Sequence, residues 1–212
     1  ASTDKANPGR GLERRAVVQR LLADRGGLLV VTGLGSSTYD AAAAGDHDLN
    51  FYLWGAMGGA AVMGLGIALA RPESPVLVIT GDGEQLMGMG ALATIGAQQP
   101  RNLAVVVLDN GLYAETGMQA SHTARGTDLA KVAGACGFAW STTIDAMSEV
   151  EALRDRIHRR EGPSFATVRI APEEPPRVLP TRDGVELKNR FRRALNLPRS
   201  KPSRGGSPAR SL

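Results

Sequence analysis

Three short apolar runs, each ending at a glycine-containing turn, constrain the fold of this 212-residue chain more than any other feature. The runs span 28–31, 76–80 and 103–108. Runs of this kind indicate strands buried on both faces, and parallel strands need crossover connections, which are usually helices. Residues at helical spacing lie between them. The alternation therefore predicts an α/β fold with three layers, α/β/α, and a mostly parallel sheet.

The other elements are predicted from periodicity and from glycine and proline breaks. Helices are expected at 12–23, 36–44, 55–70, 84–99, 128–136, 147–160 and 185–195. Weaker strands are expected at 138–143 and 165–170. We expect a single domain at 11–196, a flexible N-terminus at 1–10, and a basic, disordered tail at 197–212.

Composition argues against several classes of protein. Only 4% of the residues are aromatic, so the net charge of +4 does not predict nucleic-acid binding. Cys136 is the only cysteine, which excludes a disulfide or a cysteine-bound cluster within this chain and favours a cytoplasmic location. Residues 51–70 carry no formal charge and are long enough to span a bilayer, but their five glycines favour a closely packed buried helix. We therefore expect no membrane partner, and a membrane-associated protein is the alternative.

Oxygen-bearing side chains follow two of the apolar runs. Asp82 stands in a Gly-Asp-Gly turn after 76–80, and Asn110 comes two residues after 103–108. Ligands of parallel sheets lie beyond the carboxyl ends of the strands, and glycine turns that open helices attract anions. Each motif alone is common turn chemistry. Together they predict a phosphate-like ligand with Mg²⁺, which shares its oxygen ligands between protein, phosphate and water.

The Gly-Asp-Gly motif at 81–83, followed after twenty-five residues by Asp109-Asn110, resembles the signature of thiamine-diphosphate-dependent enzymes. The family pattern ends in two asparagines. Here the first is an aspartate, and the second, Asn110, matches the metal ligand. The resemblance implies thiamine diphosphate and Mg²⁺ as cofactors, with Asp82, Asn110 and the Leu112 carbonyl as the metal ligands.

The resemblance also implies contacts with the cofactor. Segment 54–59, Trp-Gly-Ala-Met-Gly-Gly, is similar to the segment that lines the thiamine ring in this family. The Gly55 carbonyl is then expected to accept a hydrogen bond from the 4′-amino group, and Met57 to lie between the two rings. A core methionine is the alternative interpretation of Met57. Further cofactor contacts are expected at Gly35, Ser36, Gly81, Gly83 and Glu84.

The loop at 113–119 resembles two branches of the family: the two-subunit sulfopyruvate and phosphonopyruvate decarboxylases, and the 2-oxoacid:ferredoxin oxidoreductases. Oxidoreductase subunits usually carry cysteine-bound clusters, which favours the decarboxylases here. The resemblance implies a carboxy-lyase subunit that converts a 3-sulfo- or 3-phosphonopyruvate-like 2-oxo acid to its aldehyde and CO₂. Glu115 and Gln119 are candidate catalytic residues, and His122 and Arg125 are candidate readers of the substrate anion.

The catalytic glutamate of this family belongs to a pyrimidine-binding domain, for which these residues leave no segment. The resemblance therefore implies a heteromer in which a pyrimidine-binding α subunit completes the site, and we expect the chain alone to be inactive. The alternatives are an acetolactate-synthase-like carboligase, a 2-oxoacid oxidoreductase subunit and, in another class, a non-catalytic nucleotide-binding module.

Overall fold

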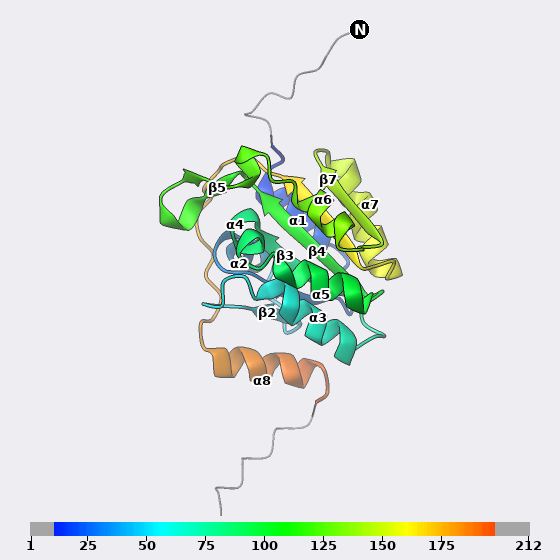
Figure 1. The fold of residues 1–212 in the computed structure, drawn as a ribbon. Coiled ribbons are helices and arrows are strands. Elements are labelled where there is room, and N and C mark those ends of the chain that lie inside the picture. The colour runs from blue at the N-terminus through cyan, green and yellow to red at the C-terminus, as the bar shows by residue number, and fades with distance from the viewer. Residues whose placement is uncertain (1–10, 198–212) are drawn as a thin grey trace, which may run out of the picture.

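The computed structural model describes residues 11–197, which form a six-stranded parallel sheet between two layers of helices (Figure 1). The strand order is β2-β1-β3-β4-β8-β7. The bounds are β1 (Leu29–Thr32), β2 (Asn50–Tyr52), β3 (Val76–Gly81), β4 (Leu103–Asp109), β7 (Trp140–Ile144) and β8 (Ser164–Arg169). The predicted α/β/α fold is confirmed. The segment predicted to be flexible, 1–10, and all of the predicted tail except Leu197 lie outside the described residues.

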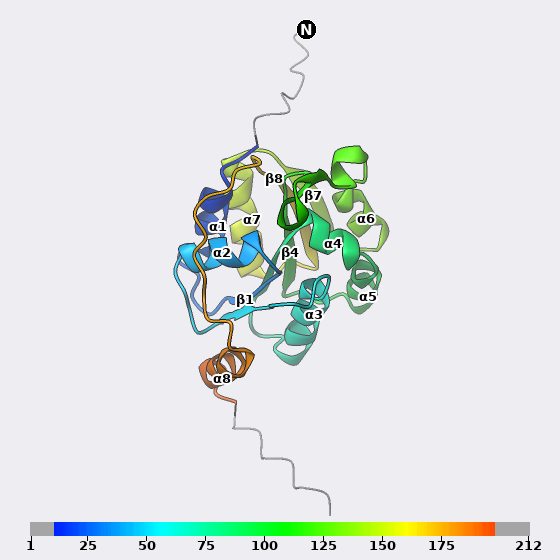
Figure 2. The ribbon, with the colours of Figure 1, turned by 90° about the vertical axis from the view of Figure 1, so that its left-hand side faces the viewer.

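Two helical layers cover the sheet (Figure 2). One consists of α1 (Arg14–Leu22), α2 (Ser36–Ala43) and α7 (Met147–Arg159), and the other of α3 (Ala60–Ala70), α5 (Gly90–Gln98) and α6 (Leu129–Ala135). Successive side chains of a strand point to opposite faces. In β3, Leu77 and Ile79 therefore pack in the core beneath the first layer, while Val76 and Val78 pack beneath the second. This double burial explains why the central strands are continuous apolar runs.

Helix α8 (Gly184–Ala194) covers the edge strand β2. Phe191 packs edge to face on Phe51 of the strand, with ring centroids 5.7 Å apart. Arg190 forms an ion pair with Asp46, 2.7 Å between nitrogen and oxygen. A helix in this position shields the open edge of the sheet from pairing with another strand. The helix predicted at 185–195 is confirmed.

Two predicted helices differ from the structure because glycines interrupt them. The helix predicted at 55–70 begins only at Ala60, since Gly55 and Gly58 have φ angles of +82° and +85°, which a right-handed helix does not allow. The helix predicted at 84–99 is divided into α4 (Asp82–Met87) and α5. The break lies at Gly88, where an added Cβ would be 2.2 Å from the Gly58 carbonyl oxygen, so the two backbones touch.

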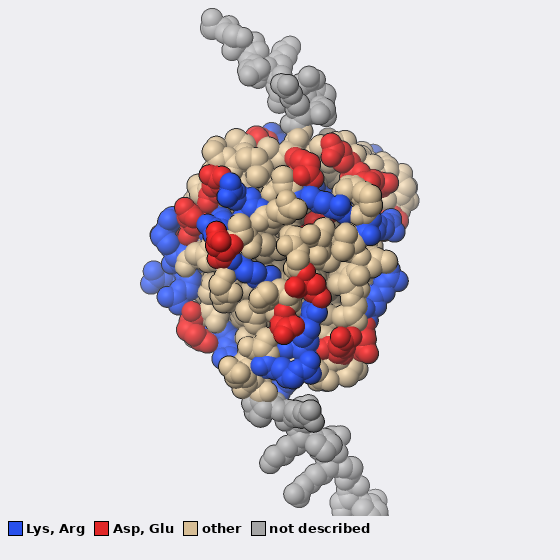
Figure 3. Space-filling model, turned by 180° about the vertical axis from the view of Figure 1, so that it is seen from behind, with Lys and Arg blue, Asp and Glu red and all other residues tan. Residues whose placement is uncertain are grey.

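Strand β2 was not predicted, nor were the short elements between β4 and α6. These are β5 (Leu112–Tyr113), η1 (Ala114–Thr116), β6 (Gln119–Ala120) and η2 (Thr123–Arg125), of which β5 and β6 pair antiparallel. Within residues 11–197, none of the helices has the length and apolar character needed to cross a bilayer. On the face shown in Figure 3, basic and acidic side chains are interspersed.

Candidate functional site

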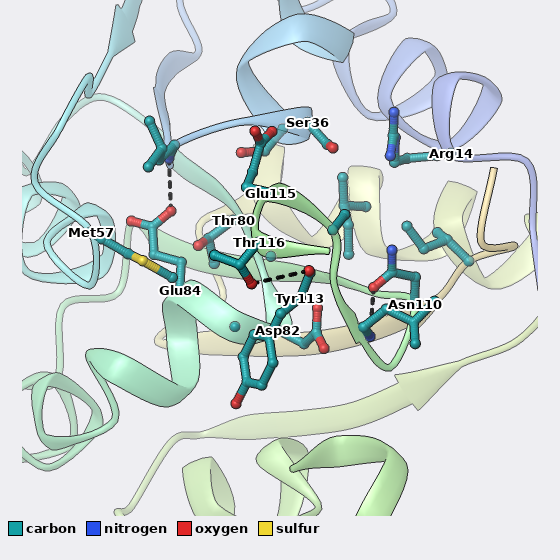
Figure 4. Close-up of a pocket in the computed structure, with 18 residues that line it drawn as sticks. Arg14, Ser36, Met57, Thr80, Asp82, Glu84, Asn110, Tyr113, Glu115 and Thr116 are labelled. Carbon is teal, nitrogen blue, oxygen red and sulfur yellow. Dashed lines mark hydrogen bonds between the residues drawn. The ribbon is translucent and has the colours of Figure 1, made fainter. Parts of the chain in front are cut away.

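A cavity lies beyond the carboxyl ends of β1, β3 and β4, which are neighbours in the sheet (Figure 4). It holds about 850 Å³ of empty space, including its open mouth. The turns that follow the three strands come together here, as the sequence predicted. The predicted site residues that line the cavity are Ser36, Met57, Gly81, Asp82, Gly83, Glu84, Asn110, Leu112 and Glu115.

Asp82 begins α4 directly after β3, and its side chain is buried. Its Oδ2 accepts hydrogen bonds from Ser121 Oγ at 2.5 Å and from Thr123 Oγ1 at 3.3 Å. Burial is the main cause that raises the pKa of the Asp82 carboxyl to about 6. The Ser121 hydrogen bond opposes this rise, and the negative charge of Asp109 adds to it. A cation bound at this carboxylate would therefore relieve an unfavourable charge.

Asp109, at the position where the family pattern has asparagine, contacts Thr123, which also contacts Asp82. The Thr123 hydroxyl, whose single hydrogen can point to either carboxylate, lies 2.8 Å from Asp109 Oδ1 and 3.3 Å from Asp82 Oδ2 and so lies between the two. The backbone N–H of Gly111 also donates to Asp109 Oδ1, at 2.9 Å. Among the described residues, no lysine or arginine forms an ion pair with Asp82 or Asp109. The pair thus carries negative charge with no basic partner.

Asn110 and Leu112 bring further oxygen atoms to the same cavity. Asn110 Oδ1 accepts a hydrogen bond from the Leu112 N–H at 2.9 Å, which fixes the amide in a turn and leaves the oxygen a second acceptor position. The described part of the chain contains no group of three or more His, Cys, Asp or Glu side chains placed to hold a metal ion. A cation held here would take most of its ligands from amide, backbone, water or phosphate oxygens. That donor set suits Mg²⁺ rather than Zn²⁺.

Glu84 connects two segments that border the cavity. Its Oε2 accepts the backbone N–H of Leu34 at 2.9 Å, and its Oε1 accepts that of Ala60 at 3.4 Å. Burial raises the pKa of the Glu84 carboxyl, and these backbone donors oppose the rise. The carboxylate lies against Gly33, where an added Cβ would be 1.6 Å from Oε2. Glu84 thus joins the turn after β1 to the start of α3.

Met57 is 43% exposed at the cavity, which argues against the core interpretation of this residue. A Cβ added to Gly83 would lie 2.8 Å from the Tyr113 ring and 3.9 Å from Met57 Cε, so glycine at this position leaves room for both side chains. The Tyr113 hydroxyl is 2.7 Å from His122 Nδ1. His122 is therefore paired with a lining residue, whereas Arg125 is exposed and does not line the cavity.

Three further predicted site residues, besides His122 and Arg125, do not line the cavity, although one of them borders it. An added Cβ at Gly35 would be 2.7 Å from Glu115 Oε1, so this glycine lies beside a lining side chain. Gly55 lies in the turn before α3. Gln119 is exposed and bonds locally, with its Nε2 donating to the Thr116 carbonyl at 3.0 Å. Of the two candidate catalytic residues, the structure brings only Glu115 to the cavity.

Sequence reasoning missed Arg14, Ser121 and Thr123. The two hydroxyl residues come from a loop far along the chain from Asp82, so no local pattern marks them. Arg14 lines the cavity and is only 6% exposed. A signal for it does exist, because Arg14 shares one face of α1 with the buried Val17 and Val18. A charged residue on an apolar helix face points to a buried polar partner.

With this geometry described, comparison with known proteins identifies the class. Residues 33–168 match the family described as thiamine pyrophosphate enzyme, C-terminal TPP binding domain, and the chain belongs to this family of thiamine diphosphate (thiamine pyrophosphate) enzymes. The sequence resemblance and the prediction of thiamine diphosphate as a cofactor are thereby confirmed, whereas Mg²⁺ stays a prediction. Benzoylformate decarboxylase from Polynucleobacter necessarius shares the fold, with a TM-score of 0.66 at 20% identity over 82% of this chain and 36% of that one.

Two relatives of known name are similar to this chain over most of its length. It is 38% identical over 205 residues to a phosphonopyruvate decarboxylase of Streptomyces viridochromogenes, which is 91% of this chain and 49% of that protein. It is 36% identical over 180 residues to the sulfopyruvate decarboxylase subunit beta of Methanothermobacter thermautotrophicus, which is 85% of this chain and 94% of that subunit. The chain thus spans about half of the first relative and nearly all of the second.

Proposed function

We propose that this chain is the thiamine-diphosphate-binding subunit of a decarboxylase that converts a 3-sulfo- or 3-phosphonopyruvate-like 2-oxo acid to its aldehyde and CO₂. The observation that carries this proposal is the 36% identity extending over 94% of a sulfopyruvate decarboxylase subunit beta. A similar identity to a phosphonopyruvate decarboxylase supports the same substrate class. Both substrates are 2-oxo acids with a second anionic group.

In this proposal Mg²⁺ is held by the side chains of Asp82 and Asn110 and by the Leu112 carbonyl, and it binds the diphosphate. The support is the donor set of the cavity: a buried carboxylate that has no basic partner within residues 11–197, beside a fixed amide oxygen. Mg²⁺ in such sites takes its remaining ligands from phosphate and water. The assisting backbone and side-chain contacts are proposed at Gly35, Ser36, Gly81, Gly83 and Glu84.

The thiazolium end of the cofactor is proposed to lie at Met57, whose exposed side chain offers apolar support between the rings. The Gly55 carbonyl is the proposed acceptor for the aminopyrimidine. When bound, thiamine diphosphate supplies the electron sink that decarboxylation requires. The residues of this chain hold and orient it, and Glu115 remains a candidate for contact with the substrate, since its carboxylate borders the cavity.

A pyrimidine-binding α subunit is proposed to cover the mouth of the cavity and to supply the catalytic glutamate. The support is an exposed apolar rim, since Leu34 and Met57 line the cavity and are 36% and 43% exposed. Exposed apolar residues around a cofactor site are typical of an interface. Paired copies of the heteromer are expected because closed symmetry is common. The cytoplasm is the proposed location, supported by an unpaired cysteine.

The test is an assay of products with the chain alone and with a pyrimidine-binding subunit, each supplied with thiamine diphosphate and Mg²⁺. Sulfopyruvate and phosphonopyruvate are offered separately, and CO₂ and aldehyde are quantified. We expect one aldehyde per CO₂ from the heteromer and none from the chain alone. A ligated product in place of the aldehyde would favour the carboligase alternative. A heteromer that binds the cofactor but releases no CO₂ from either acid would refute the proposal.

A further inference from the structure

Arg14 is an unusual residue for its place in the fold. It is the first residue of α1, where the positive end of the helix dipole disfavours a cation, and it is 6% exposed. Buried arginines require a compensating partner. Its guanidinium contacts the Asp40 carboxylate, which is completely buried, and donates to the Glu173 carbonyl at 3.4 Å. Arg14 thus occupies a buried position at the start of a helix, where the surroundings disfavour its positive charge.

The charges around Asp40 do not balance. Arg15 forms a second ion pair with the same carboxylate, 3.3 Å between Nε and Oδ1, so two guanidinium groups share a single negative charge. Glu115, another carboxylate that lines the cavity, forms an ion pair with Arg177, 3.9 Å between nitrogen and oxygen. The Arg14–Arg15–Asp40 cluster therefore carries one net positive charge, with Arg14 and Asp40 buried and the Arg15 side chain 22% exposed. An uncompensated buried charge is costly, and a bound anion would compensate it.

Only one of the two arginines faces the cavity. Arg14 lines it together with Ser36 and Asn110, whereas Arg15 does not. In Figure 4, Arg14 and Asn110 lie on one side of the cavity and Met57 on the other, with Asp82 between them. Its guanidinium has five donors: Nε contacts Asp40, and each terminal nitrogen makes one hydrogen bond, 3.4 and 3.5 Å long, which leaves donors for a ligand.

From this arrangement we infer that Arg14 binds the terminal phosphate of thiamine diphosphate. The cofactor rings lie at the Met57 end in the proposed function, on which this inference rests. The terminal phosphate is the group farthest from the rings and the most negative part of the cofactor. A guanidinium matches phosphate oxygens in charge and geometry. Asp40 acts as a positioning residue, because it holds the guanidinium at the end of the cavity.

The experiment compares binding of thiamine diphosphate and thiamine monophosphate, each with Mg²⁺, to the purified heteromer by titration calorimetry. The variant is Arg14→Gln, and Arg14→Lys retains the charge beside Asp40 should the glutamine variant fold poorly. The matched control is Arg15→Gln, which removes the other guanidinium of the cluster but no lining group. Thermal unfolding of each cofactor-free protein shows whether the fold is retained.

Arg14→Gln should weaken diphosphate binding by about tenfold or more, the effect of losing a hydrogen bond to a charged group, and change monophosphate binding by less than about threefold. Arg14→Lys should fall between Arg14→Gln and the unmodified protein. Arg15→Gln keeps the lining donor but lowers the charge of the cluster, so it should weaken diphosphate binding by less than Arg14→Gln does. Equal losses for the two cofactors, or unchanged diphosphate binding in a folded Arg14→Gln protein, would overturn the inference. These readouts do not depend on CO₂ release, so failure of the proposed reaction would be seen separately.

Discussion

The contact between Gly33 and Glu84 predicts a strong coupling between two substitutions beside the cavity. Gly33 does not have a left-handed φ angle, so alanine is allowed by the backbone, but its Cβ would lie 1.6 Å from Glu84 Oε2. The methyl group of Gly33→Ala must therefore displace the carboxylate. The displaced carboxylate would lose its hydrogen bonds to the backbone N–H groups of Leu34 and Ala60.

The expected loss in the free energy of unfolding follows from these two N–H donors. A buried N–H group left without an acceptor costs about 1–3 kcal/mol, and removing a carboxylate whose pKa is raised by burial offsets part of the loss. Glu84→Ala should thus lower the free energy of unfolding by about 2–3 kcal/mol. Gly33→Ala should cost a similar amount, because it breaks the same bonds. In the double variant the new methyl group enters space that Glu84 has left, so the loss should stay at about 2–3 kcal/mol rather than double.

The assay is equilibrium unfolding of the purified, cofactor-free protein in urea, followed by circular dichroism. Gly66→Ala is the matched control, because it lies within α3 and an added Cβ there meets no atom within 4 Å. This control should be neutral or stabilising by up to about 1 kcal/mol. Additive losses in the double variant would show that the Glu84 bonds do not depend on the glycine, and the reasoning would be refuted.

The remaining predictions concern the metal and the rings of the cofactor. Asp82→Ala and Asn110→Ala should each weaken Mg²⁺-dependent retention of thiamine diphosphate by about tenfold or more, and unchanged calorimetric affinities would rule out the metal assignment. Because Asp82 must be ionised to bind a cation and its pKa is raised to about 6, retention should fall by roughly tenfold from pH 7 to pH 5. Ser121→Ala removes a hydrogen bond that favours the ionised form, so the midpoint of that pH titration should move upward. Met57→Ala should preserve Mg²⁺ binding and lower turnover. Met57→Leu should have nearly the turnover of the unmodified protein, because the two side chains have similar volumes. Loss of metal binding in Met57→Ala would instead indicate a structural role for Met57.

The central sheet could be predicted from the sequence because its strands are long and apolar on both faces, as in 103–108. Strand β2 could not be predicted from the sequence. It has three residues, and its first, Asn50, is fully buried because other side chains satisfy it: the distant Arg25 donates to its Oδ1 at 2.6 Å, and its amide donates to the Tyr52 hydroxyl at 2.9 Å. Such a strand is stabilised by tertiary contacts, which leave no periodic pattern.

The residues of the candidate site also fall into those that the sequence predicts and those that it does not. Asp82 and Asn110 directly follow strands that the sequence marks clearly, so their approach could be expected from the parallel sheet. The hydroxyl groups that orient Asp82 come from positions 121 and 123, and the cationic end of the cavity comes from the start of α1. Their meeting depends on how loops cross the ends of the strands, which no local spacing encodes.

The central claim is that this cavity holds the Mg²⁺-bound diphosphate of thiamine diphosphate, and a crystal structure of the heteromer with the cofactor and Mn²⁺ in place of Mg²⁺ tests it most directly. Anomalous scattering locates the Mn²⁺ without reference to the surrounding protein. We predict a single peak bound by side-chain oxygens of Asp82 and Asn110, with the terminal phosphate toward Arg14 and the rings toward Met57. A peak away from Asp82, or a cofactor bound outside this cavity, would contradict the account.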